Sequence, residues 1–214
     1  MRLLRARLRA VQALDLQRIR QLHVRHPGLR IDLRAASAFA VSEYRLEAGS
    51  RLEIAAGAVT ERRRGGVRFH LGPGSSLRVG PGSWLRSDIE NVRLVTFEGA
   101  RLEIGPDAFL NGCHLSAKCE LVLGRRAWVG PGSRIFDADQ HDLDADRPEG
   151  RAPVHIGDHV WIASDVTVMK GVSIGAHSII GARSVVTRSI PAHSFAAGAP
   201  AQVLGEVGDR SRAR

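Results

Sequence analysis

The chain has 214 residues, of which 43% are hydrophobic and 5% aromatic, and its formal net charge is +9. This length allows one domain with an extension, and no apolar stretch approaches the roughly 18 residues that a membrane span needs. Residues 1–34 carry nine arginines against two aspartates, in a segment with neither aromatic platforms nor a recognised nucleic-acid module. We therefore expect no nucleic-acid partner.

Residues 2–24 are predicted to form an amphipathic helix, because their apolar residues recur at helical spacing. The stripe consists of Leu4, Leu8, Val11, Leu14, Ile19 and Leu22. His26-Pro27-Gly28 then reads as a break, so residues 1–28 form a separate unit. We expect this basic helix to cap one end of the domain that follows. The alternative is weak peripheral attachment to an anionic membrane surface.

A longer repeat follows the helix. GSRLEIAAGAV begins at Gly49, GSSLRVGPGSW at Gly74 and GARLEIGPDAF at Gly99, and related units begin at Lys118 and Ala152. The repeat predicts one strand that recurs in successive coils of a solenoid. Extra residues between the units, such as 61–66, are interpreted as solvated loops.

From residue 154 to residue 191 the period becomes six. Branched aliphatic residues occupy every sixth position, namely Ile156, Ile162, Val168, Ile174, Ile180 and Val186. Neither a helix nor a half-buried strand has this period. Three hexads would close one triangular coil, with Ile156 stacked on Ile174. The pattern thus predicts a mainly β protein built as a parallel β-solenoid.

A loop must leave the solenoid just before this stretch. Leu123, Val129 and Ile135 fit the same three columns, yet the interval from Leu123 to Ile156 is nearly twice that from Ile156 to Ile174. The excess lies within 136–153, and a polar loop in a regular repeat is often functional. It carries His141, whose imidazole titrates in the range that a general base needs. A solvated histidine, or a metal site made with Asp137 and Asp139, remains the alternative.

The hexads resemble the repeat of the left-handed β-helix acyltransferases, which reads [Leu/Ile/Val]-[Gly/Ala]-x-x-[Ser/Ala/Val]-x. IGDHVWIASDVTV, IIGARSVVTRSIP and AAGAPAQVL resemble the C-terminal signature of the O-acetyltransferase branch, which includes galactoside, maltose and cell-surface polysaccharide acetyltransferases. The resemblance implies a left-handed parallel β-helix over residues 29–204 and a polar tail over 205–214, which we expect to lack fixed structure. It also implies a homotrimer, acetyl-CoA as acyl donor, no required metal and a saccharide acceptor.

The same resemblance implies a set of site residues. His141 would be the general base, with Asp137 or Asp139 fixing the tautomer of its ring. Asn111 would bind the acceptor. The implied CoA-binding residues are Trp161, Ala163, Ser164, Ala182, Arg183, Thr187 and Arg188. The chain departs from the family at residues 199–202, where Asn-Pro-Ala followed by Lys or Arg is more usual, so a cation contact is missing there.

These observations favour an acetyl-CoA-dependent O-acetyltransferase that acts on a saccharide hydroxyl in cell-surface glycan biosynthesis. Cys113 and Cys119 are expected to be free thiols in a reducing cytoplasm, at the inner face of the membrane if the helix makes contact there. N-acetylation of an amino sugar or a nucleotide-linked amino sugar is the alternative within the same machinery, and a non-catalytic scaffold is a further one. A β-helix carbonic anhydrase would need three zinc-binding histidines. His114, His141, His155 and His159 are numerous enough, but their spacing does not resemble that family.

Overall fold

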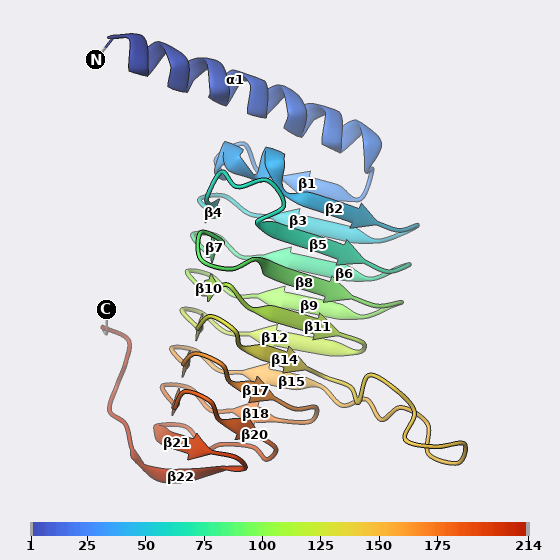
Figure 1. Cartoon of the computed structure of the whole chain (residues 1–214), viewed down its shortest axis with the longest axis vertical. Coiled ribbons are helices and arrows are strands. Elements are labelled where there is room, and N and C mark those ends of the chain that lie inside the picture. The colour runs from blue at the N-terminus through green and yellow to red at the C-terminus, as the bar shows by residue number, and fades with distance from the viewer. Residues whose placement is uncertain (1, 213–214) are drawn as a thin grey trace.

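The computed structural model describes residues 2–212, with side chains from residue 6 onward. Its strands stack along one axis into a three-sided prism, and a long helix lies across the N-terminal end (Figure 1). Each coil passes through sheet A, then sheet C, then sheet B, so the prism has an A/C edge, a C/B edge and a B/A edge. All described strand pairs are parallel except the last, between β21 and β22.

The strand bounds follow from this winding. Sheet A contains β1 (Leu29–Ile31), β3 (Arg51–Ile54), β6 (Ser76–Val79), β9 (Arg101–Ile104), β12 (Glu120–Leu123), β15 (Val154–Ile156) and β18 (Ser173–Ile174). Sheet B contains β2 (Glu43–Leu46), β5 (Val67–Leu71), β8 (Val92–Thr96), β11 (His114–Ala117), β14 (Arg134–Phe136), β17 (Thr167–Val168) and β20 (Val185–Val186). Sheet C contains β4 (Val59–Thr60), β7 (Trp84–Arg86), β10 (Phe109–Asn111), β13 (Trp128–Val129), β16 (Trp161–Ile162), β19 (Ile179–Ile180), β21 (Ser194–Gly198) and β22 (Ala201–Glu206). A short 3-10 helix, η1 (Ser37–Val41), replaces the sheet C strand in the first coil.

The three predicted aliphatic columns are confirmed. Ile156 pairs with Ile174 in sheet A, Ile162 with Ile180 in sheet C, and Val168 with Val186 in sheet B. All six side chains are at most 2% exposed. The columns continue upward through Leu123, Val129 and Ile135, as the residue count predicts. The core is therefore a stack of inward-facing aliphatic residues, one or two from each strand.

The longer repeat is also confirmed as one recurring strand. Its central leucines, Leu52, Leu77 and Leu102, pair in register in sheet A. Each copy begins with a glycine at positive φ, at +71° for Gly49 and +62° for Gly74, a conformation that other residues rarely adopt. The glycine therefore supplies the turn that leads into sheet A.

Helix α1 (Arg2–Arg25) covers the end of the prism with its second half only. Ile19 is buried and Leu22 packs against the core, whereas Leu8 is 61% and Leu14 is 54% exposed. The side chain of Leu4 lies outside the described residues. The predicted stripe is longer than the surface it can cover, and the first turns of the helix extend beyond the stack (Figure 1).

A buried carboxylate fixes this helix to the second coil. Asp15 is 1% exposed and accepts hydrogen bonds from Arg62 Nε at 2.9 Å and Arg62 Nη2 at 3.0 Å. Residues 61–66 are thus more than the solvated loop that the sequence indicated. Glu61 of the same run accepts hydrogen bonds from the Trp84 indole and the Ser87 amide. The loop joins the helical cap to the solenoid.

The C-terminal end is closed by the antiparallel pair of β21 and β22, which leaves the chain running back along the A/C edge (Figure 1). The tail was expected to lack fixed structure, but it packs against a stack of imidazoles. His159, His177 and His193 have ring centroids 4.9 and 4.8 Å apart, and the Arg210 amide donates to His177 Nδ1 at 3.0 Å. Both cysteines are free thiols. Within the described chain, α1 is too polar to span a membrane.

Candidate functional site

The predicted loop leaves the prism at the B/A edge, between β14 and β15 (Figure 1). Asp137, fully buried, accepts hydrogen bonds from the amides of Lys118 at 2.7 Å and Cys119 at 2.8 Å. Ala138 and Arg151 form an antiparallel bridge, so the two arms of the loop run together. The base of the loop is therefore fixed to the coil above it.

Two lysines hold the loop from either side. Lys118 Nζ donates to the Gln140 carbonyl at 3.1 Å and to Glu149, and both side chains of this ion pair are about 10% exposed. The hydrogen bond from Lys118 holds the pKa of Glu149 below its usual value. Lys170 Nζ lies 2.9 Å from Asp139, which also accepts from the Gly150 amide. Sequence reasoning missed this role, although these are the only two lysines among 31 basic residues.

His141 is exposed on this loop and follows Gln140, whose φ is +74°. No hydrogen bond or ion pair joins His141 to Asp137 or Asp139 within the described residues. The hypothesis that one of these carboxylates fixes the ring tautomer is therefore not met in this chain. Asp137 binds backbone amides and Asp139 binds Lys170, so both position the loop rather than the ring.

The residues predicted to bind CoA divide between two edges of the prism. Ala163 and Ser164 lie at the C/B edge, and Ala182 and Arg183 lie one coil further along the same edge, where the Arg183 amide donates to the Ser164 carbonyl at 3.0 Å. Trp161 lies beside them on sheet C and is 41% exposed. Thr187 and Arg188 follow β20 at the B/A edge and are exposed. Within one chain, the width of sheet B separates the two groups.

Asn111 ends β10 at the C/B edge and is 8% exposed. Its Oδ1 atom is buried and has no hydrogen-bond partner among the described residues. A buried carbonyl oxygen without a donor is uncommon in folded proteins. The atom therefore has room for a hydrogen bond that the described residues do not supply.

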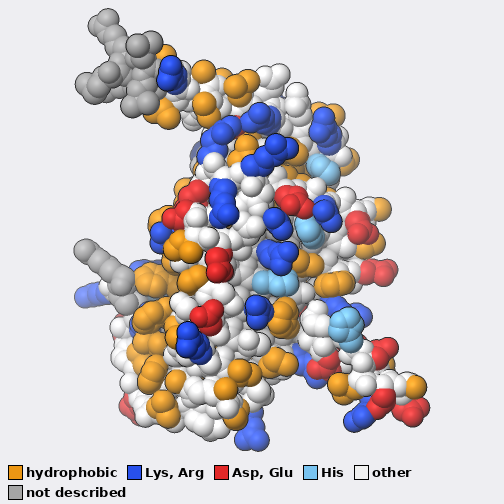
Figure 2. Space-filling view, viewed as in Figure 1, with side chains coloured by type: hydrophobic (Ala, Val, Ile, Leu, Met, Phe, Trp, Pro, Cys, Tyr) orange, Lys and Arg blue, Asp and Glu red, His pale blue; other side chains and the backbone are white. Residues whose placement is uncertain are grey.

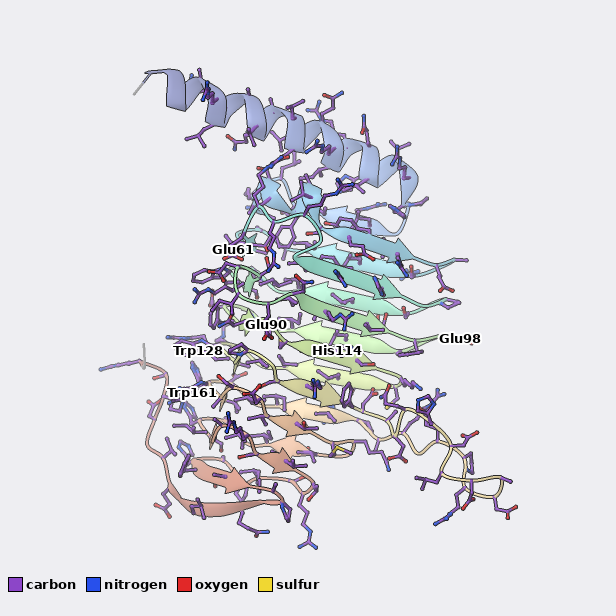
Figure 3. All side chains as sticks on the ribbon, in the orientation of Figure 1. Glu61, Glu90, Glu98, His114, Trp128 and Trp161 are labelled. Carbon is purple, nitrogen blue, oxygen red and sulfur yellow. The ribbon has the colours of Figure 1, made fainter. Side chains whose placement is uncertain are left out.

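The outer face of sheet C carries a column of apolar side chains, six of them in consecutive coils from β4 to β19 and the last on β21. Ring centroids are 5.2 Å apart for Trp84 and Phe109 and 6.2 Å apart for Phe109 and Trp128. Trp128 and Trp161 lie on the same side of the molecule (Figure 3). The complete column is Val59, Trp84, Phe109, Trp128, Trp161, Ile179 and Phe195. Exposed aromatic surface of this extent marks a contact or binding face.

The histidines of the carbonic anhydrase alternative lie on different faces. His114 belongs to sheet B, His155 to sheet A and His159 to the A/C edge. Across residues 2–212 no group of three or more His, Cys, Asp or Glu side chains is arranged to hold a metal ion.

Comparison with known proteins agrees with this architecture. Residues 153–188 match the family described as bacterial transferase hexapeptide (six repeats). The galactoside O-acetyltransferase of Escherichia coli is 43% identical over 118 residues, which cover 53% of this chain and 58% of the relative. The chain spans less than two thirds of the length of the first curated relatives it matches.

Two solved structures share the fold. The polysialic-acid-specific acetyltransferase NeuO has a TM-score of 0.66 at 20% identity, covering 87% of this chain and 81% of that one. The polysialic acid O-acetyltransferase OatWY has a TM-score of 0.54 at 20% identity, covering 86% and 87%. The fold is the left-handed parallel β-helix of transferases with hexapeptide repeats. Over residues 153–188 the chain carries the hexapeptide repeat of this transferase family.

Proposed function

We propose that the protein is an O-acetyltransferase that moves the acetyl group of acetyl-CoA to a saccharide hydroxyl. The observation that carries this proposal is the loop at the B/A edge, which presents His141 from a base fixed by Asp137, Lys118 and Lys170. The hexapeptide-repeat match over residues 153–188 and the named activity of the Escherichia coli relative support the same reaction.

His141 would act as the general base. An alcohol is a poor nucleophile near neutral pH, so a base must accept its proton as the oxygen attacks the thioester carbonyl. A carbon–oxygen bond forms, the carbon–sulfur bond breaks, and the proton passes from His141 to the departing thiolate. Asn111 Oδ1, which is buried and unpaired among the described residues, would accept a hydrogen bond from the acceptor.

We propose that the active unit is a homotrimer with its sites between protomers. His141, Thr187 and Arg188 lie at the B/A edge, whereas Asn111 and the other predicted CoA residues lie toward the C/B edge. The two groups meet only if the B/A edge of one copy faces the C/B edge of the next, and three prisms in a closed ring satisfy this. The apolar column on sheet C is the kind of surface that a neighbouring copy would cover.

The assembly is tested by light scattering, which should give three times the chain mass of 23.2 kDa. Phe109→Glu in the middle of the apolar column should shift the mass toward that of a monomer, because a neighbour would bury the new charge. Arg45→Gln on the outer face of sheet B, away from sheet C, is the matched control and should stay trimeric. A parent protein that is monomeric at micromolar concentration contradicts the shared site.

We further propose a cytoplasmic location, where acetyl-CoA is available, with weak contact between α1 and the inner face of the membrane. The exposed leucines of the first half of α1 support such a contact. Binding to anionic vesicles should be weak and should disappear at high salt, because screening removes the arginine contribution. Vesicle binding that resists salt would show a stronger anchor than this proposal describes.

His141→Ala is the direct test of the chemistry. The variant should fold, assemble and bind CoA like the parent, but lose about 10² to 10⁴ in the rate of acetyl transfer. His155→Ala, an exposed histidine on sheet A, is the matched control. Near-parent turnover by His141→Ala would exclude the general-base role, and absence of CoA binding by the parent would favour a scaffold.

The acceptor atom is read from the product. A screen of saccharides with and without amino groups, followed by product mass, identifies the acceptor. Treatment with alkali then distinguishes the two chemistries, because an acetyl ester is hydrolysed much faster than an acetamide. A product that resists alkali would favour N-acetylation.

A further inference from the structure

The outer face of sheet B carries a column of basic side chains. Arg68, Arg93, His114 and Arg134 pair in register on β5, β8, β11 and β14, one in each of four consecutive coils. The residue that follows each of them is buried at 0% exposure, so the four side chains face outward. Figure 2 shows Lys, Arg and His side chains along this face, and Figure 3 labels His114 in the middle of it. We call these four residues the basic column.

Most of this positive charge is unpaired. The side chains of Arg93 and Arg134 are exposed and make no hydrogen bond or ion pair within the described residues, and only Arg68 reaches an acid, Glu43, at 3.4 Å. The pKa of His114 is lowered by its burial and then by Arg93 and Arg134. At neutral pH the arginines therefore carry the charge.

Sheet A shows that the same repeat can neutralise its charges. Its outward positions alternate in sign, so Arg78 lies 3.6 Å from Glu53 and Arg101 lies 2.8 Å from Glu120. Like charges opposite each other on neighbouring strands destabilise a sheet. The basic column places like charges on neighbouring strands of sheet B, and an anion bound along the column would reduce their repulsion.

Within one chain, the basic column lies between the two edges that carry the proposed site residues, and it ends beside the His141 loop. Asn111 is at the C/B edge just before β11, and the His141 loop begins at the B/A edge just after β14. Three steps of about 4.8 Å between strands make the column about 14 Å long. This is longer than one pyranose ring, so the column suits a saccharide chain rather than a single sugar.

We propose that the acceptor is an anionic saccharide chain, whose carboxylate or phosphate groups bind Arg93 and Arg134 on the outer face of sheet B. This inference rests on the proposed function and names the class of its acceptor. Guanidinium groups form strong paired hydrogen bonds with both kinds of anion. The chain would lie along the basic column with its reacting hydroxyl toward the His141 loop.

Acidic residues of a second copy are the competing occupant, because the loop is rich in aspartate. Two of these are already engaged within their own loop. Asp142 accepts from the Glu149 amide at 2.6 Å, and Asp144 accepts from Arg147 Nε at 2.7 Å. Glu43, in register with Arg68, and Glu90, at the margin of this face (Figure 3), are acids that border the basic column. Of the two loop aspartates, only Asp144 is neutralised by a cation, whereas Asp142 binds a neutral amide, and Asp146 makes no ion pair within the described residues. The effect of the arginine variants on the trimer therefore decides between the two occupants.

Binding is tested without catalysis by using immobilised polyuronate, a phosphodiester-linked polysaccharide and neutral dextran. The parent should bind at least one of the two anionic polymers and should not bind dextran. It should lose the binding at about 0.5 M salt, where the screening length falls to a few ångströms. Arg93→Gln and Arg134→Gln should each weaken binding about tenfold, the effect of losing one charge-assisted hydrogen bond. Arg51→Gln on sheet A, which removes another exposed charge, should leave it unchanged. The preferred polymer identifies the anion.

Kinetics separate the remaining outcomes. With an anionic acceptor, the two variants should raise the KM for the acceptor and leave the KM for acetyl-CoA unchanged. A rise in the KM for acetyl-CoA instead would assign the arginines to CoA phosphates, and loss of the trimer would assign them to a protomer contact. Equal binding of dextran and the anionic polymers would also overturn the proposal. His141→Ala should still bind the anionic polymer, so loss of activity alone does not decide this question.

Discussion

Replacing Lys118 with Met should loosen the His141 loop while leaving the solenoid intact. Methionine keeps the length of the side chain beside Phe97 but removes the hydrogen bonds to the Gln140 carbonyl and to Glu149. Two hydrogen bonds from a charged donor contribute about 3 kcal/mol at the low end of their usual range. A loss of this size raises the fraction of open loop about 100-fold.

Hydrogen exchange measures this opening directly. The amides of Asp139 and Ala152 are hydrogen-bonded inside the loop, to the carbonyls of Gly150 and Asp137, and should exchange about 100-fold faster in Lys118→Met. Amides of the sheets should keep their parent rates, because local opening leaves the core folded. Under the proposed function, kcat falls and the KM for acetyl-CoA stays constant.

Arg147→Gln is the matched control, since it removes a cation from the same loop whose one ion pair among the described residues is with exposed Asp144. Exchange in the control should stay close to that of the parent. If the loop amides of Lys118→Met also exchange at parent rates, the reasoning that this lysine holds the loop is wrong.

Three further predictions concern stability. Ile174→Asp puts a carboxylate into a column position that is 1% exposed, and should unfold or aggregate the protein; an unchanged melting temperature would contradict the stacked core. Among the described residues, Arg62→Ala leaves the buried Asp15 with the more distant Arg18 as its one partner, so it should lower the melting temperature, and Arg62→Lys should restore part of the loss. The pKa of His159 is lowered by burial and then by His177 and Arg126. The folded state therefore favours the neutral ring, and it keeps its full stability above the ordinary histidine pKa of about 6.5. Part of this stability is lost as the pH falls from that value through the lowered pKa. His159→Gln should therefore show a weaker loss of melting temperature between pH 7.5 and 5.5 than the parent, and equal losses would contradict this.

The regular coils could be predicted from the sequence because each hexad places one aliphatic residue inside. Ile156, Ile162 and Val168 therefore fix the register of three faces, and the residue count then requires the loop. The early coils vary in length, so the three sequence intervals that separate Arg68, Arg93, His114 and Arg134 all differ. No single period aligns these four positions, and the basic column and the apolar column become visible only in three dimensions.

The candidate site also combines features that the sequence predicts with features that only the structure reveals. The position of His141 follows from counting, and its exposure on an extruded loop agrees with that expectation. Asp137 accepts hydrogen bonds from the amides of residues 118 and 119, which lie one coil earlier. The sequence around Asp137 does not indicate whether its carboxylate binds backbone amides or the ring of His141. The burial of helix α1 could be predicted only in part. Helical periodicity identifies the apolar stripe, but it does not give the width of the solenoid end against which the helix packs.

The insertion between β14 and β15 leaves the stack undisturbed. Nearly twice as much chain separates Leu123 from Ile156 as separates Ile156 from Ile174, yet both pairs stack in the same register. A corner of this solenoid therefore tolerates insertions, because a segment there can be lengthened, shortened or exchanged without altering any column of the core. The length of the loop and the folding of the core are then separable properties of the chain, so a transplanted loop should leave the prism that carries it unchanged.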